Sequence, residues 1–173
     1  MELDDSRLVA EATDGAPHAV GELFRRHWSD VWRAAYAVCG RRELANDVTQ
    51  EAFVRAISAL GTFDGRRSFR PWVTRIAVNA AIDELRSERR LTKRDENDVQ
   101  PAATVDWPMD DDVIRAVARL APERRLIVAL HYWLDYQTPE IAELLDLPLG
   151  TVASRLSRAL ADLRIDLEGD DRA

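Results

Sequence analysis

The sequence predicts an all-α fold of two small helical domains, and three features of the chain carry that prediction. Ala, Leu, Arg and Glu dominate the composition, and these residues favour helix. Strict alternation of β-branched and polar residues is missing, whereas apolar residues recur every three or four positions. The seven glycines and seven prolines cluster between these periodic segments, where helices end. A length of 173 residues suits one ordinary domain or two small ones.

The boundary between the two domains is the clearest feature of the organisation. Residues 91–109 lack helical periodicity, are polar and contain two prolines, which is typical of a linker. We therefore expect a first domain at residues 1–92, a flexible linker at 93–109 and a second domain at 110–173. Trp107 is expected to pin the linker to one domain by burying its ring.

The composition excludes several classes of protein. Charged residues make up 32% of the chain, and no apolar run approaches the roughly 18 residues of a membrane span. The acidic start of the chain lacks the order of a secretion signal. Cys39 is the only cysteine, and the three histidines share no metal-ligand spacing with it or with each other. No Gly-rich phosphate loop or nucleophile–base spacing occurs either. We expect a cytoplasmic protein that is not an enzyme and holds no metal or other cofactor.

The distribution of charge points to a local contact with nucleic acid. The net charge is −7, a poor match for a protein that binds DNA unaided, because phosphates are neutralised by clustered Lys and Arg. From Asp64 to Arg94, however, nine basic residues stand against four acidic ones. A basic island in an acidic chain indicates nucleic-acid binding with help from a partner.

Two helices are expected in the first half of the chain, at residues 20–39 and 43–60. The first carries a core-facing apolar stripe that includes Phe24. The second is apolar on one side and carries Asp47, Gln50 and Glu51 on the other, with Val54 in the middle of that polar side. An exposed valine ringed by acidic and amide groups fits either a solvated face or a docking surface.

The loop at residues 61–69 interleaves two aromatic rings with two arginines. These residues are Phe63, Arg66, Arg67 and Phe69. Aromatic and guanidinium planes can stack on an unpaired base. The alternative, which the pattern leaves equally open, is that both rings pack in the core and the arginines are solvated.

A third helix is expected from Ser68, a good N-cap, to Arg90. Most of its circumference is apolar or small, which is typical of a buried helix. One narrow stripe is polar and consists of Arg75, Asn79, Asp83, Arg86 and Arg90. Burying these groups unpaired would cost several kcal/mol, so the stripe is expected to face water or a polar ligand such as nucleic acid.

The C-terminal segment predicts a helix-turn-helix motif. Thr138 is the expected N-cap of a short helix that Asp146-Leu147-Pro148 ends. A second helix follows, with Val152, Leu156, Leu160 and Leu163 expected inward. Its outward side carries Thr151, Ser154, Arg155 and Arg158. Hydroxyls and arginines on the second helix favour DNA binding over a plain αα-hairpin.

Three motifs together resemble a known family. Residues 45–53 and 69–86 are similar to domain 2, and residues 138–156 to domain 4, of extracytoplasmic-function (ECF) sigma factors of the sigma-70 family. The resemblance runs over nearly the whole chain in the family's order and spacing. It implies a sigma domain 2 helical bundle joined to a sigma domain 4 helix-turn-helix.

The resemblance also implies partners for the surfaces described above. The face with Val54 would dock on the β′ clamp helices of core RNA polymerase. The β subunit of the polymerase would also contact the protein. The residue 61–69 loop and the polar stripe would melt and read the −10 element of promoter DNA, and the outward side of the last helix would read the −35 element. An anti-sigma factor would hold the protein inactive. Leu149 and Ala153 depart from the acidic residue and the Lys that are common in the family.

Two other classes remain as alternatives. A helix-turn-helix regulator that binds DNA without polymerase would dimerise on a two-fold site, and no segment is typical of a dimerisation helix, so we expect a monomer when free. A regulatory adaptor could use the same helices for protein contacts only. The acidic balance suits such an adaptor, but the hydroxyls and arginines of the last helix would then have no role.

Overall fold

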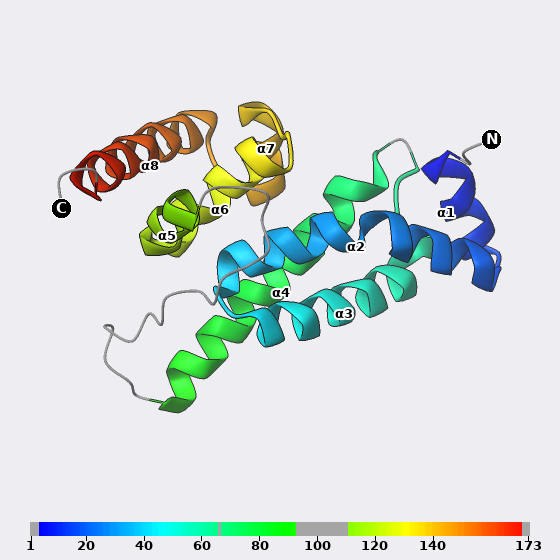
Figure 1. The fold of residues 1–173 in the computed structure, drawn as a ribbon. Coiled ribbons are helices and arrows are strands. Elements are labelled where there is room, and N and C mark those ends of the chain that lie inside the picture. The colour runs from blue at the N-terminus through cyan, green and yellow to red at the C-terminus, as the bar shows by residue number, and fades with distance from the viewer. Residues whose placement is uncertain (1–3, 66, 93–110, 171–173) are drawn as a thin grey trace.

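The computed structural model describes residues 4–65, 67–92 and 111–170, and every element of secondary structure in those ranges is helical. The first domain consists of α1 (Asp5–Thr13), α2 (Pro17–Cys39), α3 (Arg42–Ala59), the 3₁₀ turn η1 (Leu60–Thr62) and α4 (Phe69–Thr92). Figure 1 shows α2, α3 and α4 as long helices running side by side, with α1 against the N-terminal end of α2. The expected helices are confirmed to within three residues. The linker at 93–109, with Trp107, lies outside the described residues.

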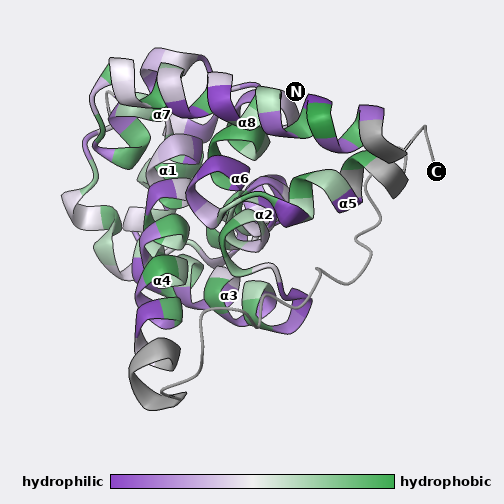
Figure 2. Ribbon diagram, turned by 90° about the vertical axis from the view of Figure 1, so that its left-hand side faces the viewer, coloured by the Kyte–Doolittle hydropathy of each residue, from purple (hydrophilic) through white to green (hydrophobic). Residues whose placement is uncertain are grey.

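Small side chains let the long helices of the first domain approach one another closely. Ala52 and Ala56 of α3 and Ala77 of α4 are fully buried in a core that also holds Phe53 and Val73. Figure 2 shows hydrophobic and hydrophilic residues alternating along the helices of both domains, as amphipathic helices require. The three helices therefore form a bundle, and a second cluster of their buried side chains is shared with the second domain.

The second domain is assembled from shorter helices. Its elements are α5 (Asp111–Arg119), α6 (Pro122–Val128), the π-helical turn η2 (Ala129–Trp133), α7 (Thr138–Leu145) and α8 (Leu149–Asp170). Asp146 ends α7 in the left-handed conformation at φ 54°, and the N–H of Leu147 donates to Ala142 O at 2.9 Å. The turn joins α7 to α8 in a helix-turn-helix, as expected.

The cap of α7 differs from the prediction. Gln137, not Thr138, is the N-cap, and Thr138 occupies the first helical position. The backbone N–H of Gln137 donates to the Glu140 carboxylate at 2.6 Å, and the Gln137 side chain accepts from the backbone of Glu140 in return. A capping box led by an amide was overlooked because Thr is the stronger N-cap residue in general.

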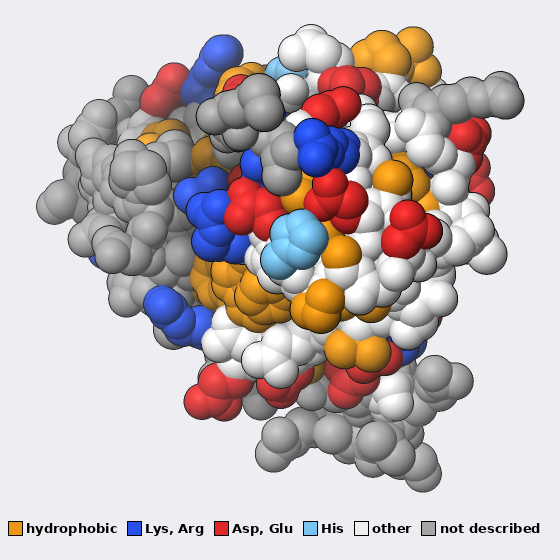
Figure 3. Space-filling view, turned by 90° about the vertical axis from the view of Figure 1, so that its right-hand side faces the viewer, with side chains coloured by type: hydrophobic (Ala, Val, Ile, Leu, Met, Phe, Trp, Pro, Cys, Tyr) orange, Lys and Arg blue, Asp and Glu red, His pale blue; other side chains and the backbone are white. Residues whose placement is uncertain are grey.

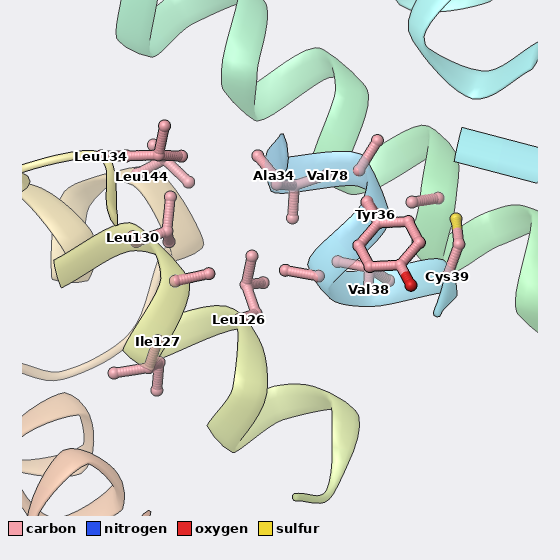
Figure 4. Close-up of a cluster of buried hydrophobic side chains, with 14 of the residues drawn as sticks. Ala34, Tyr36, Val38, Cys39, Val78, Leu126, Ile127, Leu130, Leu134 and Leu144 are labelled. Carbon is pink, nitrogen blue, oxygen red and sulfur yellow. The ribbon is translucent and has the colours of Figure 1, made fainter. Parts of the chain in front are cut away.

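The two domains share one hydrophobic core. Figure 4 shows Val38 and Val78 of the first domain and Leu126 and Leu130 of the second in one cluster of buried hydrophobic side chains. Gly40 ends α2 in the left-handed conformation at φ 67°, and the last turn of α2 is buried against α6. The interface therefore resembles the interior of a domain more than a contact between two surfaces.

A buried arginine joins the domains at the end of α2. Arg125 of α6 donates from Nε to Ala37 O at 2.6 Å and from Nη2 to Val38 O at 3.3 Å. Its Nη1 donates to Ala118 O of its own domain at 3.0 Å. A cation at the C-terminal end of a helix interacts favourably with the exposed carbonyls and the helix dipole. Burial lowers the pKa of Arg125, because desolvation disfavours its charged form.

A second set of polar contacts joins α4 to the segment that precedes α7. Arg70 donates from Nη2 to Leu134 O, and its guanidinium carbon lies 4.9 Å from the centre of the Tyr136 ring. Tyr136 is buried, and its hydroxyl donates to Thr74 Oγ1 at 3.5 Å. Desolvation raises the pKa of the Tyr136 phenol. These contacts hold the second domain over the N-terminal half of α4.

Candidate protein- and DNA-binding surfaces

The polar side of α3 is exposed as expected. Asp47, Gln50 and Glu51 are all exposed, and Val54 in their midst is 59% exposed. Glu51 forms an ion pair with Arg55 one turn later, at 2.8 Å. Val54 belongs to none of the hydrophobic clusters of the described residues, so its side chain is available to a partner. We refer to Asp47, Gln50, Glu51 and Val54 as the α3 face.

The α3 face continues into an apolar band that the sequence pattern did not reveal. Phe24 was expected in the core, yet it is 38% exposed and packs its ring on Phe53 at a centroid distance of 4.8 Å. Ile57 of α3 is 40% exposed and lies about 60° around the helix from Val54. Figure 3 looks at the end of the first domain that carries α1 and shows hydrophobic side chains reaching the surface. The apolar band therefore extends from α3 onto α2.

The two phenylalanines of the residue 61–69 loop have different environments. Phe69 is only 3% exposed and belongs to the core of the first domain, so the expectation that it presents its ring to a base is wrong. Phe63 is half-buried, and its ring packs on Trp72 at 4.7 Å and edge-on to Phe69 at 6.1 Å. Phe69 thus supports Phe63 from beneath. Arg66 lies outside the described residues.

The polar stripe of α4 is accessible along part of its length. Asn79, Asp83 and Arg86 are exposed, and Asp83 forms an ion pair with Arg86 at 3.6 Å, as expected from their spacing. The side chain of Arg90 lies outside the described residues. Since neither member of the ion pair is buried, a nucleic-acid ligand can compete for both.

The other end of the stripe is engaged by the second domain. Arg67 forms an exposed ion pair with Glu143 of α7 at 3.3 Å, and Arg75 donates to the carbonyl of the same residue at 3.5 Å. Two of the candidate DNA-binding arginines therefore contact α7 in this conformation. An anionic ligand would compete with Glu143 for Arg67.

The outward side of α8 carries the expected groups, two of which are partly covered. Arg158 and Ser154 are exposed, whereas Thr151 and Arg155 are half-buried. The Ser154 hydroxyl donates to Thr151 O at 3.0 Å. The expectation that Leu160 points inward is wrong, because it is 39% exposed, while Val152 is fully buried.

Acidic residues of α8 are confined to its second half, and two of them pair with arginines of the same domain. Asp162 forms an ion pair with Arg124, and Asp166 with Arg119 at 3.7 Å. From Leu149 to Ala161 the helix has no acidic residue. The half of α8 next to the turn is thus locally basic in a chain whose net charge is −7.

Among the described residues, no group of three or more His, Cys, Asp and Glu side chains could hold a metal ion. In the same ranges, no helix is long and apolar enough to cross a membrane. The exposed surfaces on α3, α4 and α8 are therefore the features that call for a function.

Comparisons with known proteins agree with the motifs. Residues 23–91 match the sigma-70 region 2 family, and residues 110–163 match the sigma-70 region 4 family. The chain is 34% identical over 164 residues to the ECF RNA polymerase sigma factor SigM of Mycobacterium tuberculosis (strain ATCC 25618 / H37Rv), covering 94% of this chain and 84% of the relative. It is 27% identical over 184 residues to SigW of Bacillus subtilis (strain 168), covering 96% and 98%.

Solved structures show the same arrangement of helices. CnrH in complex with the cytosolic domain of CnrY superposes with a TM-score of 0.70 at 28% identity, covering 96% of this chain and 98% of that one. The sigma factor RpoE of Bartonella quintana, in complex with the anti-sigma factor NepR, shares the fold with a TM-score of 0.73 at 19% identity, covering 86% and 96%. With both family regions present in order and relatives that match along their length, the chain belongs to the ECF class of sigma-70 family RNA polymerase sigma factors.

Proposed function

We propose that this sigma factor binds core RNA polymerase through the α3 face and contacts promoter DNA through α4 and α8. The observation that carries the proposal is that each family region falls on one domain and that each domain exposes polar side chains on a helix of that region. In the first domain these are the α3 face and the polar stripe of α4, and in the second the outward side of α8. The protein acts in the cytoplasm by binding, without catalysing a reaction of its own.

The −10 element is assigned to α4 and the loop before it. Asn79, Asp83 and Arg86 offer amide, carboxylate and guanidinium groups to bases that have left the duplex. Phe63 offers one side of its ring for stacking, and stacking stabilises a captured base by about 1–3 kcal/mol. Phe69 has a supporting role only, because it is buried.

The −35 element is assigned to α8, the second helix of the helix-turn-helix. The N-terminal residues of such a helix contact base edges in the major groove. Arg158 and Arg155 can bind a guanine edge or a phosphate. Ser154 and Thr151 contribute hydroxyls on the same side.

The closed arrangement of the two domains must open for both elements to be bound. The −10 and −35 elements are separated by about 25 base pairs, or roughly 85 Å of duplex at ~3.4 Å per base pair. A compact chain of this length has a radius of gyration of only about 16 Å. We infer that core polymerase separates the domains. This agrees with the low promoter affinity expected of the free, acidic protein.

Control by an anti-sigma factor is part of the proposal. CnrH binds the cytosolic domain of CnrY, and RpoE of Bartonella quintana binds NepR. A partner of that kind would suit the apolar band formed by Phe24, Val54 and Ile57, since exposed apolar patches mark protein interaction sites.

The polymerase-binding role is tested by charge insertion on the α3 face. Val54→Asp places a charge in an apolar contact, so we expect affinity for core polymerase to fall at least tenfold, with Gln50→Ala having a smaller effect. Ala10→Asp makes a matched change at an exposed residue of α1. Pull-down with core polymerase, circular dichroism and run-off transcription are measured on the same variants. Unchanged core affinity with an intact fold would show that the α3 face is merely solvated.

A second measurement separates the sigma role from that of an independent DNA-binding regulator. We expect promoter binding at physiological salt only when core polymerase is present. Tight, sequence-specific binding by the purified chain alone would contradict the sigma role and favour the regulator.

A further inference from the structure

The hydroxyl group of Ser154 already uses its only proton within the helix. Ser154 lies in the second turn of α8 and is exposed, and its Oγ donates to the backbone oxygen of Thr151 at 3.0 Å. A serine hydroxyl has one proton to donate and two lone pairs that accept. While the bond to Thr151 persists, Ser154 can therefore meet a ligand only as a hydrogen-bond acceptor.

Ser154 lies on the side of α8 that is assigned to DNA. At about 100° per residue, Thr151 and Arg158 are within about 60° of Ser154 around the helix axis, whereas the buried Val152 lies on the opposite side. Gly150 is one turn earlier on the same side as Ser154, and a Cβ built on it would meet no atom of another element within 4 Å. A base edge can therefore approach the Ser154 hydroxyl.

The other polar side chains in this half of α8 leave the acceptor role open. Arg155 and Arg158 carry guanidinium groups, which donate hydrogen bonds and accept none. From Leu149 to Ala161 the helix has no Asp or Glu, and carboxylates are the side chains that usually accept from the amino group of cytosine. Among the side chains of this half, only a hydroxyl can therefore accept a hydrogen bond from an amino group of a base.

We propose that Ser154 selects a base with an amino group in the major groove, adenine or cytosine, at one position of the upstream promoter element. The proposal rests on the assignment of α8 as the −35 reader. Adenine N6 and cytosine N4 are donors at the major-groove edge, whereas thymine O4 and guanine O6 are acceptors. A donor base can bind Ser154 while the bond to Thr151 stays in place. An acceptor base requires the hydroxyl proton to leave Thr151, so one hydrogen bond is lost for the one that is made.

The test removes the amino group of one base at a time. Holoenzyme assembled with the wild-type chain selects a promoter from templates with a randomised upstream element. Each adenine of that element is then replaced singly by purine, which lacks the N6 amino group, and each cytosine by pyrimidin-2-one, which lacks the N4 amino group. Wild-type holoenzyme is expected to lose about fivefold in affinity at one position, which corresponds to one hydrogen bond of about 1 kcal/mol. The replacement that has this effect identifies the base.

Variants on the same helix separate this contact from a change in the duplex itself. Ser154→Ala holoenzyme is expected to bind the natural template about fivefold less tightly than wild type, and to bind the natural and amino-deleted templates equally. Arg158→Ala is expected to weaken binding to both templates while the fivefold difference between them persists. Ser157→Ala removes another exposed hydroxyl of α8 and is expected to keep the same difference.

Each other outcome has one meaning. If Arg155→Ala and Arg158→Ala both leave upstream recognition intact, α8 is not the reader and the functional assignment of this helix fails. If those variants weaken binding but no amino deletion distinguishes wild type from Ser154→Ala, the reader stands and the role of Ser154 is wrong. Replacement of guanine by 2-aminopurine removes O6, and a loss of affinity there that Ser154→Ala abolishes would show that the hydroxyl donates, which also overturns the proposal. If Ser154→Ala weakens binding to every template equally, Ser154 contacts a phosphate and selects no base.

Discussion

Arg125 and Arg158 belong to the same small domain, but their surroundings are opposite. Arg125 is buried, and carbonyl oxygens of both domains satisfy its guanidinium. Arg158 is exposed on α8, and no ion pair or hydrogen bond of its side chain is found among the described residues. A guanidinium that is already satisfied stabilises the fold, whereas one without a partner is available to a ligand.

The same contrast separates two sides of the second domain. The side formed by α6, η2 and α7 completes a core with the first domain, and its polar groups are used in that contact. The half of α8 next to the turn packs Val152, Leu156 and Ala159 into hydrophobic clusters and exposes Ser154 and Arg158 on its other side. Substitutions on the α6, η2 and α7 side should therefore change the free energy of unfolding. Substitutions on the exposed side of α8 should change promoter affinity.

The largest expected effect is on the buried side. Arg125→Met keeps most of the aliphatic stem but removes the donors to Ala37 O and Val38 O. Hydrogen bonds to a charged group contribute about 1.5–3 kcal/mol each, partly offset by relief of the charge burial. We expect the free energy of unfolding to fall by about 3 kcal/mol in chemical denaturation.

Arg158→Met is the matched control for that substitution. Its unfolding free energy should stay within about 0.5 kcal/mol of the wild type, because the side chain is exposed. Its promoter affinity in holoenzyme should fall by about 1–3 kcal/mol if it contacts a base edge, and evenly across sequences if it contacts a phosphate. If Arg125→Met were as stable as Arg158→Met, the contrast between the two faces would be wrong.

The sequence pattern does not distinguish buried arginines from exposed ones. Arg124 and Arg125 are adjacent in a run that reads as the start of an ordinary helix, yet one pairs with Asp162 and the other reaches the end of α2. Helical periodicity reports which face of a helix is apolar, but not which distant segment covers it. The helices and the motif of α7 and α8 were predictable because their signals are local.

The burial of aromatic side chains was also difficult to predict from the sequence. Phe24 and Phe69 both fit more than one arrangement, since a ring at helical spacing can lie in the core or at its edge. The structure places Phe69 inside and Phe24 partly outside. Each ring also contacts a ring from another helix, Phe24 with Phe53 of α3 and Phe69 with His27 of α2, and helical periodicity does not predict those contacts.

A smaller effect is expected at the contact between α4 and the second domain. Arg70→Ala removes the hydrogen bond to Leu134 O and the stacking on Tyr136. It also removes an ion pair with Asp30, in which Arg70 Nε lies 2.8 Å from Asp30 Oδ2 but is not aligned for a hydrogen bond. The side chain is about a third exposed, so solvent screens the ion pair. We expect a loss of about 1–2 kcal/mol in unfolding free energy.

Arg67→Ala is the comparison for Arg70→Ala. Its ion pair with Glu143 also joins the domains, but both partners are exposed. Chemical denaturation should show a change of no more than about 0.5 kcal/mol, decreasing further at high salt. A larger loss for Arg67→Ala than for Arg70→Ala would show that exposed charges, and not the buried contacts, hold the domains together.

The buried phenols of Tyr136 and Tyr36 should make the stability of the fold depend on pH under alkaline conditions. Burial raises the pKa of Tyr136 above its ordinary value of 10.0, and burial raises the pKa of Tyr36 in the same interface. As the pH rises past about 10, the unfolded chain therefore loses these phenol protons before the folded chain does. The unfolding free energy must then fall with increasing pH, by at most about 1.4 kcal/mol per pH unit for each phenol.

Tyr136→Phe isolates the part of this slope that belongs to the domain interface. At neutral pH the substitution removes only a long hydrogen bond to Thr74, at 3.5 Å, so stability should change by less than about 1 kcal/mol. Between about pH 9 and pH 11 the variant should lose stability less steeply than the wild type, because one of the two buried phenols is gone. Denaturant titrations at several pH values, with Tyr36→Phe as a parallel variant, measure both slopes. Equal slopes for wild type and Tyr136→Phe would mean that Tyr136 meets solvent in the native state, and that the domains do not stay closed in solution.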